Sequence, residues 1–189
     1  MSTASQKANN AFVCSWREKQ LLDGYSGEIH PDSRVLDVGC GNGTIGKSVA
    51  DAFQAHVEGA DVVNMLSFPL SFHALPEAWN TFPEKSFDVV MLNDALHHMR
   101  PDIQISTLRH ALRVGKKILI FDTYPTLLAK VLDLIMGSAI YKGREAIPLT
   151  HKTPEAWCEC IKKLGYTPTY RAVSKPFFFY PLHHFVIVV

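Results

Sequence analysis

Short apolar runs alternate along the chain with segments in which apolar residues recur every three or four positions. The continuous runs are typical of buried strands, and the spaced segments are typical of helices that pack by one face. Strands are predicted over 34–38, within 56–63, and over 87–92, 117–121, 169–173 and 185–189. Helices are predicted over 44–53, 101–114 and from Thr153 and Pro154 to Gly165. Alternating strands and helices predict an α/β fold with a parallel or mostly parallel sheet and helices on both faces.

The length and composition indicate one globular domain. The chain has 189 residues, of which 47% are hydrophobic and 11% aromatic, which is enough to fill a core and too apolar for a disordered chain. Lys and Arg number 19 against 18 Asp and Glu. Because proteins that bind nucleic acid usually carry a basic excess, no nucleic-acid partner is expected. We expect a monomer or homodimer whose partner is a small molecule.

Nothing in the sequence indicates export or insertion into a membrane. The first ten residues are polar and lack the apolar region of a secretory signal. The most apolar helical stretch, 127–140, contains Lys130 and Asp133 and falls short of the roughly 20 apolar residues of a membrane span. The four cysteines are too few and too irregularly placed for a disulfide framework. A cytoplasmic protein with no integral membrane association is expected.

A glycine-rich loop carries the clearest chemical signal. The residues from Asp37 to Gly43 read D-V-G-C-G-N-G, directly after a predicted strand and before a predicted helix. Glycines let the backbone approach a ligand closely, and the free amides of a helix start attract a negatively charged group. Asp61 ends the next predicted strand 18 residues beyond Gly43, where a carboxylate can accept hydrogen bonds from ribose hydroxyls. Together the two features predict a nucleotide-like ligand.

Two cofactors fit this spacing. Gly41, Gly43 and Gly46 satisfy G-x-G-x-x-G, the fingerprint of dinucleotide-binding proteins, and Asp61 lies 20 residues after Gly41. Asp37 favours S-adenosylmethionine instead, because a carboxylate at the entrance of the loop would repel a pyrophosphate. The same carboxylate would attract the ammonium and sulfonium groups of S-adenosylmethionine.

The segment VLDVGCGNGTIG, then Asp61, then SFDVVMLNDALHHM resemble the class I S-adenosylmethionine-dependent methyltransferases over the stretch from Arg34 to Asp122. FPEKSFDVVMLNDALHH and LRHALRVGKKILIFD are most similar to the branch that includes the ubiquinone and menaquinone biosynthesis methyltransferases. The resemblance implies S-adenosylmethionine as the cofactor. It also implies a Rossmann-like, doubly wound, seven-stranded and mostly parallel sheet with an antiparallel last strand.

The resemblance assigns residues to the cofactor. Asp37 and the glycines of the loop would hold the methionine end, Asp61 the ribose, and the backbone carbonyl of Asn93 the cofactor's amino group. An acid after the third strand usually faces the adenine in this family, and Glu77 is the nearest candidate here. The complete set of expected cofactor-binding residues is Asp37, Gly39, Cys40, Gly41, Gly43, Asp61, Val62, Glu77 and Asn93.

His97 and His98 are the expected catalytic residues. Methyl transfer is an in-line displacement on a cationic sulfonium, so positioning and the exclusion of water do most of the catalysis. A base is needed only when the acceptor has a proton to lose, and histidine suits that role near neutral pH. Adjacent side chains diverge, so at most one of the two faces the cofactor, and His98 is preferred. The alternative is that one of them caps or packs against the following helix.

The acceptor side is less defined. Tyr124 and Trp16 are expected to contact the substrate, and Asp122 either does so or caps the following helix. The stretch 124–144 has a broad apolar face, which either packs on the sheet or forms a lid for an apolar or aromatic acceptor. Residues 12–22 would close the other side.

No metal site is predicted, because Cys158 and Cys160 point to different helix faces and no matching pair occurs elsewhere. Cys40 is interpreted as a small filler of the loop rather than a nucleophile. The aromatic cluster over 177–180, beside His183 and His184, is interpreted as core or strand edge, with a role in the acceptor pocket as the alternative. The single domain is divided into an amino-terminal helical lid (1–30), a cofactor-binding core (31–123), a substrate-side helical insertion (124–152), and a closing helix and strands (153–189).

The sequence therefore predicts an S-adenosylmethionine-dependent methyltransferase that acts on a small, apolar or aromatic acceptor. Two alternatives stay open at this stage. One is an NAD(P)-binding oxidoreductase that uses the same glycine loop, and the other is a non-catalytic protein that binds S-adenosylmethionine without transferring its methyl group.

Overall fold

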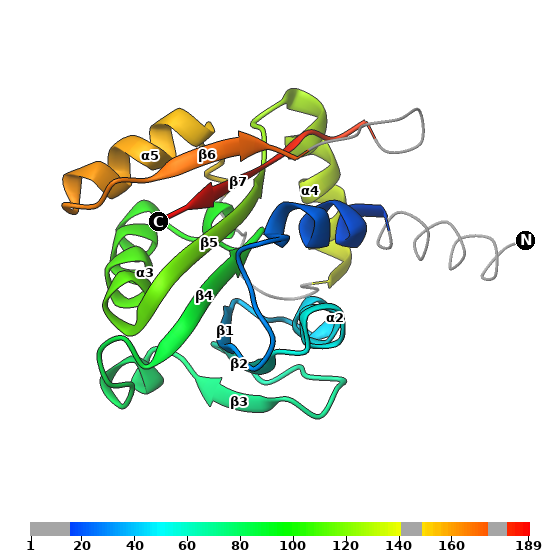
Figure 1. Cartoon of the computed structure of the whole chain (residues 1–189). Helices are drawn as coiled ribbons and strands as arrows, with labels where there is room; N and C mark the ends of the chain where they lie inside the picture. The colour runs from blue at the N-terminus through cyan, green and yellow to red at the C-terminus, as the bar shows by residue number, and fades with distance from the viewer. Residues whose placement is uncertain (1–15, 141–148, 174–180) are drawn as a thin grey trace, which may run out of the picture.

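Seven strands form one sheet in the order β3-β2-β1-β4-β5-β7-β6 (Figure 1). The computed structural model describes residues 16–140, 149–173 and 181–189. The strands are β1 Arg34–Val38, β2 His56–Asp61, β3 Ser71–Ala74, β4 Phe87–Asn93, β5 Gly115–Thr123, β6 Thr169–Ala172 and β7 His184–Val188. Neighbours from β3 to β5 are parallel, whereas β7 runs antiparallel to β5 and to β6. The expected mostly parallel sheet with an antiparallel last strand is confirmed.

Helices cover both faces of this sheet. The α-helices are α2 Thr44–Phe53, α3 Pro101–Val114, α4 Leu127–Ile140 and α5 Pro154–Lys163; the short 3-10 helices are η1 Glu77–Asn80 and η2 Leu96–His98. Residues 16–25 are helical as well. One core cluster joins α3 and α5 to one face of the sheet, and a second joins α2 and the helix over 16–25 to the other. The doubly wound architecture is therefore confirmed.

The central strands follow from their composition. β4 is buried along almost its whole length, as a near-continuous apolar run in a parallel sheet with both faces covered must be. β5 extends two residues beyond each end of the predicted run 117–121. The sequence pattern does not predict β3, because its four residues, SFHA, are all half-buried or exposed at the sheet edge and give no apolar run.

The apolar face of α4 lies on the surface. Leu127 is 80% exposed, Ile135 58% and Val131 45%, so the interpretation that the apolar face of this helix packs on the sheet is wrong. Ala129 is the buried residue of the helix's first turn. The alternative interpretation, a lid over the acceptor, stays a prediction, and its residues 141–144 lie outside the described part of the chain.

Three further expectations involve residues outside the described ranges. They are the amino-terminal part of the stretch 12–22, the aromatic cluster 177–180, and a segment of the insertion 124–152. Among the described residues, no helix is long and apolar enough to cross a lipid bilayer.

The same substitution on two helices should separate the core from the surface. Leu108 of α3 is completely buried, whereas Leu134 of α4 is exposed. Leu108→Ala should lower the free energy of unfolding by about 2–5 kcal/mol through lost burial and a residual cavity. Leu134→Ala should change it by less than about 0.5 kcal/mol. Urea unfolding followed by circular dichroism measures both; equal losses would contradict this assignment of the core.

Candidate active site

The candidate active site lies where β1, β2, β4 and β5 end. These strands are parallel neighbours, so their carboxyl ends meet at one edge of the sheet. The chain leaves β1 between β2 on one side and β4 on the other, which is the switch point at which open α/β sheets bind ligands. The glycine loop, Asp61 and the segment after β4 converge there.

The glycine loop has a backbone that other residues would strain. Gly39 has φ +77°, and a Cβ built on it would lie 2.7 Å from the Cβ of Ala95. Gly41 has φ +52°, and open space surrounds the position of its Cβ. Because Gly41 lacks a side chain, a ligand can reach the backbone from that open side.

Asp61 ties the end of β2 to this loop. Its Oδ2 accepts a hydrogen bond from the backbone N–H of Gly41 at 2.9 Å, and its Oδ1 accepts one from the N–H of Val62 at 2.7 Å. Val62 is 69% exposed and presents an apolar side chain beside the carboxylate. A carboxylate held next to an exposed apolar residue can bond ribose hydroxyls while the apolar residue packs on a base.

A buried hydrogen-bond chain lies behind the loop. The Nδ2 of Asn93 donates to Oδ1 of Asp37 at 3.0 Å, and the hydroxyl of Tyr25 donates to Oδ1 of Asn93. The Oδ2 of Asp37 is buried and has no hydrogen-bond partner among the described residues. Burial raises the pKa of Asp37, the Asn93 hydrogen bond opposes this rise, and the nearby charge of Asp61 adds to it, giving a value of about 7. No sequence motif had singled out Tyr25.

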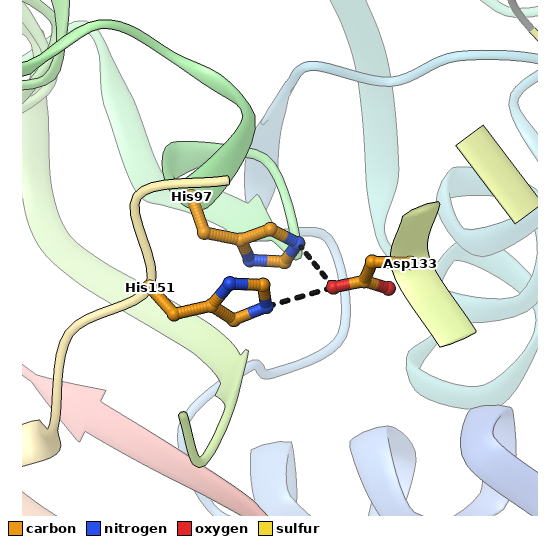
Figure 2. A group of neighbouring side chains, drawn as sticks. All are labelled: His97, Asp133 and His151. Carbon is orange, nitrogen blue, oxygen red and sulfur yellow. Dashed lines mark hydrogen bonds and ion pairs between the residues drawn. The ribbon is translucent and has the colours of Figure 1, made fainter. Parts of the chain in front are cut away.

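A second polar cluster lies beyond β4 and β5. His97 is buried on η2, and its Nδ1 lies 2.6 Å from Oδ1 of Asp122 at the end of β5. The ring of His151 stacks on that of His97 with centroids 4.2 Å apart. In Figure 2 the Nε2 atoms of both rings point to one carboxylate oxygen of Asp133 from α4, at 3.4 Å from His97 and 2.7 Å from His151.

This cluster corrects the expectation for Asp122. The residue is 1% exposed and contacts His97, so it neither lies open to a substrate nor caps α4. The hydroxyl of Thr126 caps α4 by accepting from the N–H of Ala129. Burial lowers the pKa of His97, but the carboxylate of Asp122 outweighs it and, with those of Asp94 and Asp133, raises the value to about 9.

His98 lies beside this cluster and differs from His97. Its ring centroid is 4.1 Å from that of His97, and its Nδ1 is buried without a hydrogen-bond partner among the described residues. Burial, together with the positive charge on His97, lowers the pKa of His98 to about 4. The residue is only half-buried, so a neutral imidazole lies close to the surface of the site.

Asp94 joins the amino-terminal helix to the site. It follows β4 with a left-handed backbone, φ +47°, and the Nε of Arg17 donates to its Oδ2 at 2.6 Å. Burial raises the pKa of Asp94, but Arg17 and the histidines around it lower the value to about 2. Arg17 therefore brings the helix over 16–25 against the edge of the sheet on which β4 ends. No sequence signal had singled out Arg17.

The remaining predicted residues occupy varied positions. Cys40 is buried, and burial together with Asp37 and Asp61 raises the pKa of its thiol to about 12, which suits the predicted filler. Glu77 is exposed on η1, three residues beyond β3. Tyr124 packs edge-to-face on Phe185 of β7 at 5.1 Å, and Trp16 is half-buried. The cofactor and substrate contacts expected of these residues stay predictions.

Sheet order, strand directions and the placement of the glycine loop define the class: this is the fold of the Rossmann-like methyltransferases. The family described as "Methyltransferase domain" matches residues 8–169, and the chain belongs to it. The resemblance to class I S-adenosylmethionine-dependent methyltransferases is therefore confirmed, with S-adenosylmethionine as the cofactor of the family. The narrower resemblance to the ubiquinone and menaquinone branch stays a prediction.

Curated relatives support the same family. Phosphoethanolamine N-methyltransferase 1 of Arabidopsis thaliana is 34% identical over 106 residues, which cover 50% of this chain and 22% of the relative. Phosphoethanolamine N-methyltransferase of Triticum aestivum is 32% identical over 135 residues, covering 65% of this chain and 24% of the relative. The chain thus spans about a quarter of the length of these relatives.

Solved structures share the fold at low identity. A SAM-dependent methyltransferase from Archaeoglobus fulgidus superposes with a TM-score of 0.67 at 14% identity, covering 95% of this chain and 93% of that one. A second structure is that of the 1,6-didemethyltoxoflavin-N1-methyltransferase of Burkholderia thailandensis with bound 1,6-didemethyltoxoflavin and S-adenosylhomocysteine. It superposes with a TM-score of 0.62 at 19% identity, covering 100% of this chain and 90% of that one.

The residues present fit S-adenosylmethionine. The unpartnered buried Oδ2 of Asp37 supplies negative charge that the cofactor's ammonium and sulfonium would offset. The open side of Gly41 leaves room for a ligand against the backbone. Asp61 and the exposed Val62 offer a hydrogen-bonding carboxylate and an apolar surface of the kinds that suit a ribose and an adenine.

The affinity for S-adenosylhomocysteine should depend on pH through Asp37. The ligand's ammonium favours the carboxylate form, yet with a pKa of about 7 Asp37 is mostly protonated in the free protein at lower pH. Binding must then release a proton, so the dissociation constant should rise about tenfold per unit as pH falls below about 7 and stay level above it.

Titration calorimetry from acid to mildly alkaline pH, repeated in buffers of different ionisation enthalpy, measures both the affinity and the released proton. Asp37→Asn is the control, because an amide cannot titrate and the profile should flatten. A pH-independent affinity of the unsubstituted protein would exclude Asp37 from the cofactor site.

Proposed function

We propose that this protein transfers the methyl group of S-adenosylmethionine to the nitrogen of a small polar amine. The observation that carries the proposal is that the half-buried His98 lies near the carboxylates of Asp94 and Asp133 where β4 ends, because negative charge there favours an amine over an apolar acceptor. The relatives reported above, which are phosphoethanolamine N-methyltransferases, support the same chemistry. An amine of the phosphoethanolamine type is therefore the acceptor to test first.

The protein's contribution to this reaction is mainly positional. S-adenosylmethionine supplies a methyl group on a positively charged sulfur, and this charge disappears as the methyl leaves. The glycine loop and Asp61 would hold the cofactor at the end of β1 and β2. The helix over 16–25, which Arg17 connects to Asp94, would reduce the access of water on one side. An acceptor held in line with the methyl group then reacts without an oxyanion hole.

A protonated amine needs a base before it can react. An ammonium nitrogen has no lone pair, so it must lose a proton to attack the methyl carbon. The imidazole of His98 is half-buried and, with its lowered pKa, neutral, and it is the group that we assign to accept this proton. His97 cannot take the same role, because its Nδ1 contacts Asp122 and its ring is enclosed.

An apolar or aromatic acceptor is the second candidate. The observation in its favour is the exposed apolar face of α4, where Leu127, Leu134 and Ile135 lie on the surface. Tyr124 and Trp16 would be the aromatic contacts of such an acceptor. The lid formed by α4 would then place apolar side chains over the acceptor.

An acceptor comparison decides between these two functions. The full chain is incubated with S-adenosylmethionine and either phosphoethanolamine or a simple hydroquinone, and S-adenosylhomocysteine and the methylated product are quantified by mass spectrometry. Methylation of phosphoethanolamine alone supports the proposal, and methylation of the hydroquinone alone replaces it by the second candidate. Cofactor binding with transfer to neither would favour a non-catalytic S-adenosylmethionine-binding protein.

Asp61→Ala should weaken the binding of S-adenosylhomocysteine by about 1.5–3 kcal/mol for each hydrogen bond lost between the carboxylate and the ribose. The substitution also frees the N–H of Gly41, so a stability measurement must accompany the titration. Asp32→Ala, at an exposed carboxylate outside the site, is the matched control. An unchanged affinity in Asp61→Ala would remove this residue from the site.

His98→Ala should leave the affinity for S-adenosylhomocysteine nearly unchanged while lowering kcat about 10²–10⁴-fold, which is the usual contribution of a general base. Steady-state kinetics with the acceptor that the protein methylates gives kcat, and calorimetry gives the affinity for S-adenosylhomocysteine, so the two effects are measured separately. His56→Ala replaces an exposed histidine on β2 and should keep kcat. A His98→Ala variant with full kcat would exclude His98 as the base.

A further inference from the structure

The cluster of His97, Asp133 and His151 is unusual for a site built only to bind a cofactor and an amine. It draws on three separate segments, namely η2, α4 and the chain just before α5 (Figure 2). Two imidazole nitrogens and one carboxylate oxygen, one atom from each residue, lie within 4.8 Å of one another. We propose that these three residues bind one divalent transition-metal ion of the Zn²⁺ type.

The distances are compatible with a shared ion. Ligand atoms bound tetrahedrally at about 2.0–2.1 Å from Zn²⁺ lie about 3.3 Å apart. The Nε2 of His97 lies 3.4 Å from Oδ2 of Asp133 and has no hydrogen-bond partner among the described residues. The Nε2 of His151 is closer, at 2.7 Å, and must separate slightly from the carboxylate when an ion enters.

The surroundings of His97 are those of a metal ligand. Its other ring nitrogen, Nδ1, contacts the buried carboxylate of Asp122 at 2.6 Å. This arrangement of carboxylate, imidazole and metal fixes the tautomer that exposes Nε2 and makes the ring a stronger ligand. Asp122 therefore has a positioning role that does not require contact with a substrate.

The backbone holds His151 in place as well. The N–H of Thr150 donates to the carbonyl of His97 at 2.8 Å, and the hydroxyl of Thr150 donates to the carbonyl of Met99 at 2.8 Å. The side chain of His151 is fully buried, whereas that of Asp133 is 27% exposed, which leaves a route for an ion from solvent. Two histidines and one carboxylate are a ligand set that suits zinc and related ions.

The charge balance also favours a cation. When His97 gives up its proton to bind the ion, Asp122 and Asp133 place two negative charges in a largely enclosed space, which the ion offsets. Asp94 also approaches His97, but Arg17 pairs with that carboxylate, so it is not counted among the ligands. Three protein ligands would leave a fourth position for water, as in zinc sites that take part in catalysis rather than in purely structural sites.

The test uses the full chain without a histidine tag and measures Zn²⁺ directly. Equilibrium dialysis with elemental analysis should give one Zn²⁺ per chain with a Kd of about 1 μM or tighter near pH 8, with release of the proton that His97 carries at that pH. His151→Gln and Asp133→Asn should each weaken binding at least about tenfold, because each removes a ligand. Binding of Co²⁺ in place of Zn²⁺ should give an intense visible absorption band that both variants lose.

The matched controls are His56→Gln and Asp32→Asn, which alter an exposed histidine and carboxylate outside the cluster and should keep the ion. Circular dichroism of the metal-free variants establishes whether they fold. If His151→Gln does not fold, Asp133→Asn still tests the proposal, because Asp133 is partly exposed and its substitution disturbs the core less. Zn²⁺ binding that is unchanged in both cluster variants overturns the proposal, as does the absence of binding. The cluster would then be a hydrogen-bonded contact between α4 and the chain just before α5.

This inference is independent of the acceptor. Zn²⁺ binding and S-adenosylhomocysteine binding are measured in separate experiments. A protein that does not bind Zn²⁺ can therefore still bind S-adenosylhomocysteine, and the two proposals are tested independently.

Discussion

The parallel pairing of β1 with β2 on one side and β4 on the other is the constraint on which the site depends. Parallel strands end at the same edge of the sheet, so residues far apart in the chain are brought together there without any local contact. Asp37 and Asn93 are 56 residues apart, yet they share a hydrogen bond because their strands are neighbours. The glycine loop that follows β1 then lies between the ends of β2 and β4.

The concentration of buried polar groups at this edge has an energetic consequence. Burial of a carboxylate is costly unless it is paired or hydrogen-bonded. Asp37 is only partly compensated, and its raised pKa reflects this; a bound cation would complete the compensation. Asp122 is compensated by His97, and Asp94 by Arg17. The protein thus retains polar groups that cost stability where they can bind ligands and move protons.

The helices outside the central sheet differ in what they contribute. The helix over 16–25 is part of the core through Leu21 and Tyr25, which are fully buried, and it also supplies Tyr25 and Arg17 to the site. It is therefore more than the lid that its sequence indicated. By contrast, α4 leaves apolar residues at the surface and contributes Asp133 to the cluster around His97.

The sequence by itself determined the class of fold and the cofactor loop. Apolar runs and helical spacing reflect which faces of the strands and helices are buried, and the glycine motif consists of consecutive residues. The strands, the helices and the glycine loop can therefore be predicted from the sequence alone. Strand β3 could not be predicted in this way, because it lies at the edge of the sheet and its residues are half-buried or exposed. Tertiary structure alone decided the partners of His97, the reach of Tyr25 and Arg17 into the site, and the exposure of α4. These contacts join segments that are far apart in the sequence and meet only when the sheet and helices pack together. The local spacing of residues therefore cannot predict them.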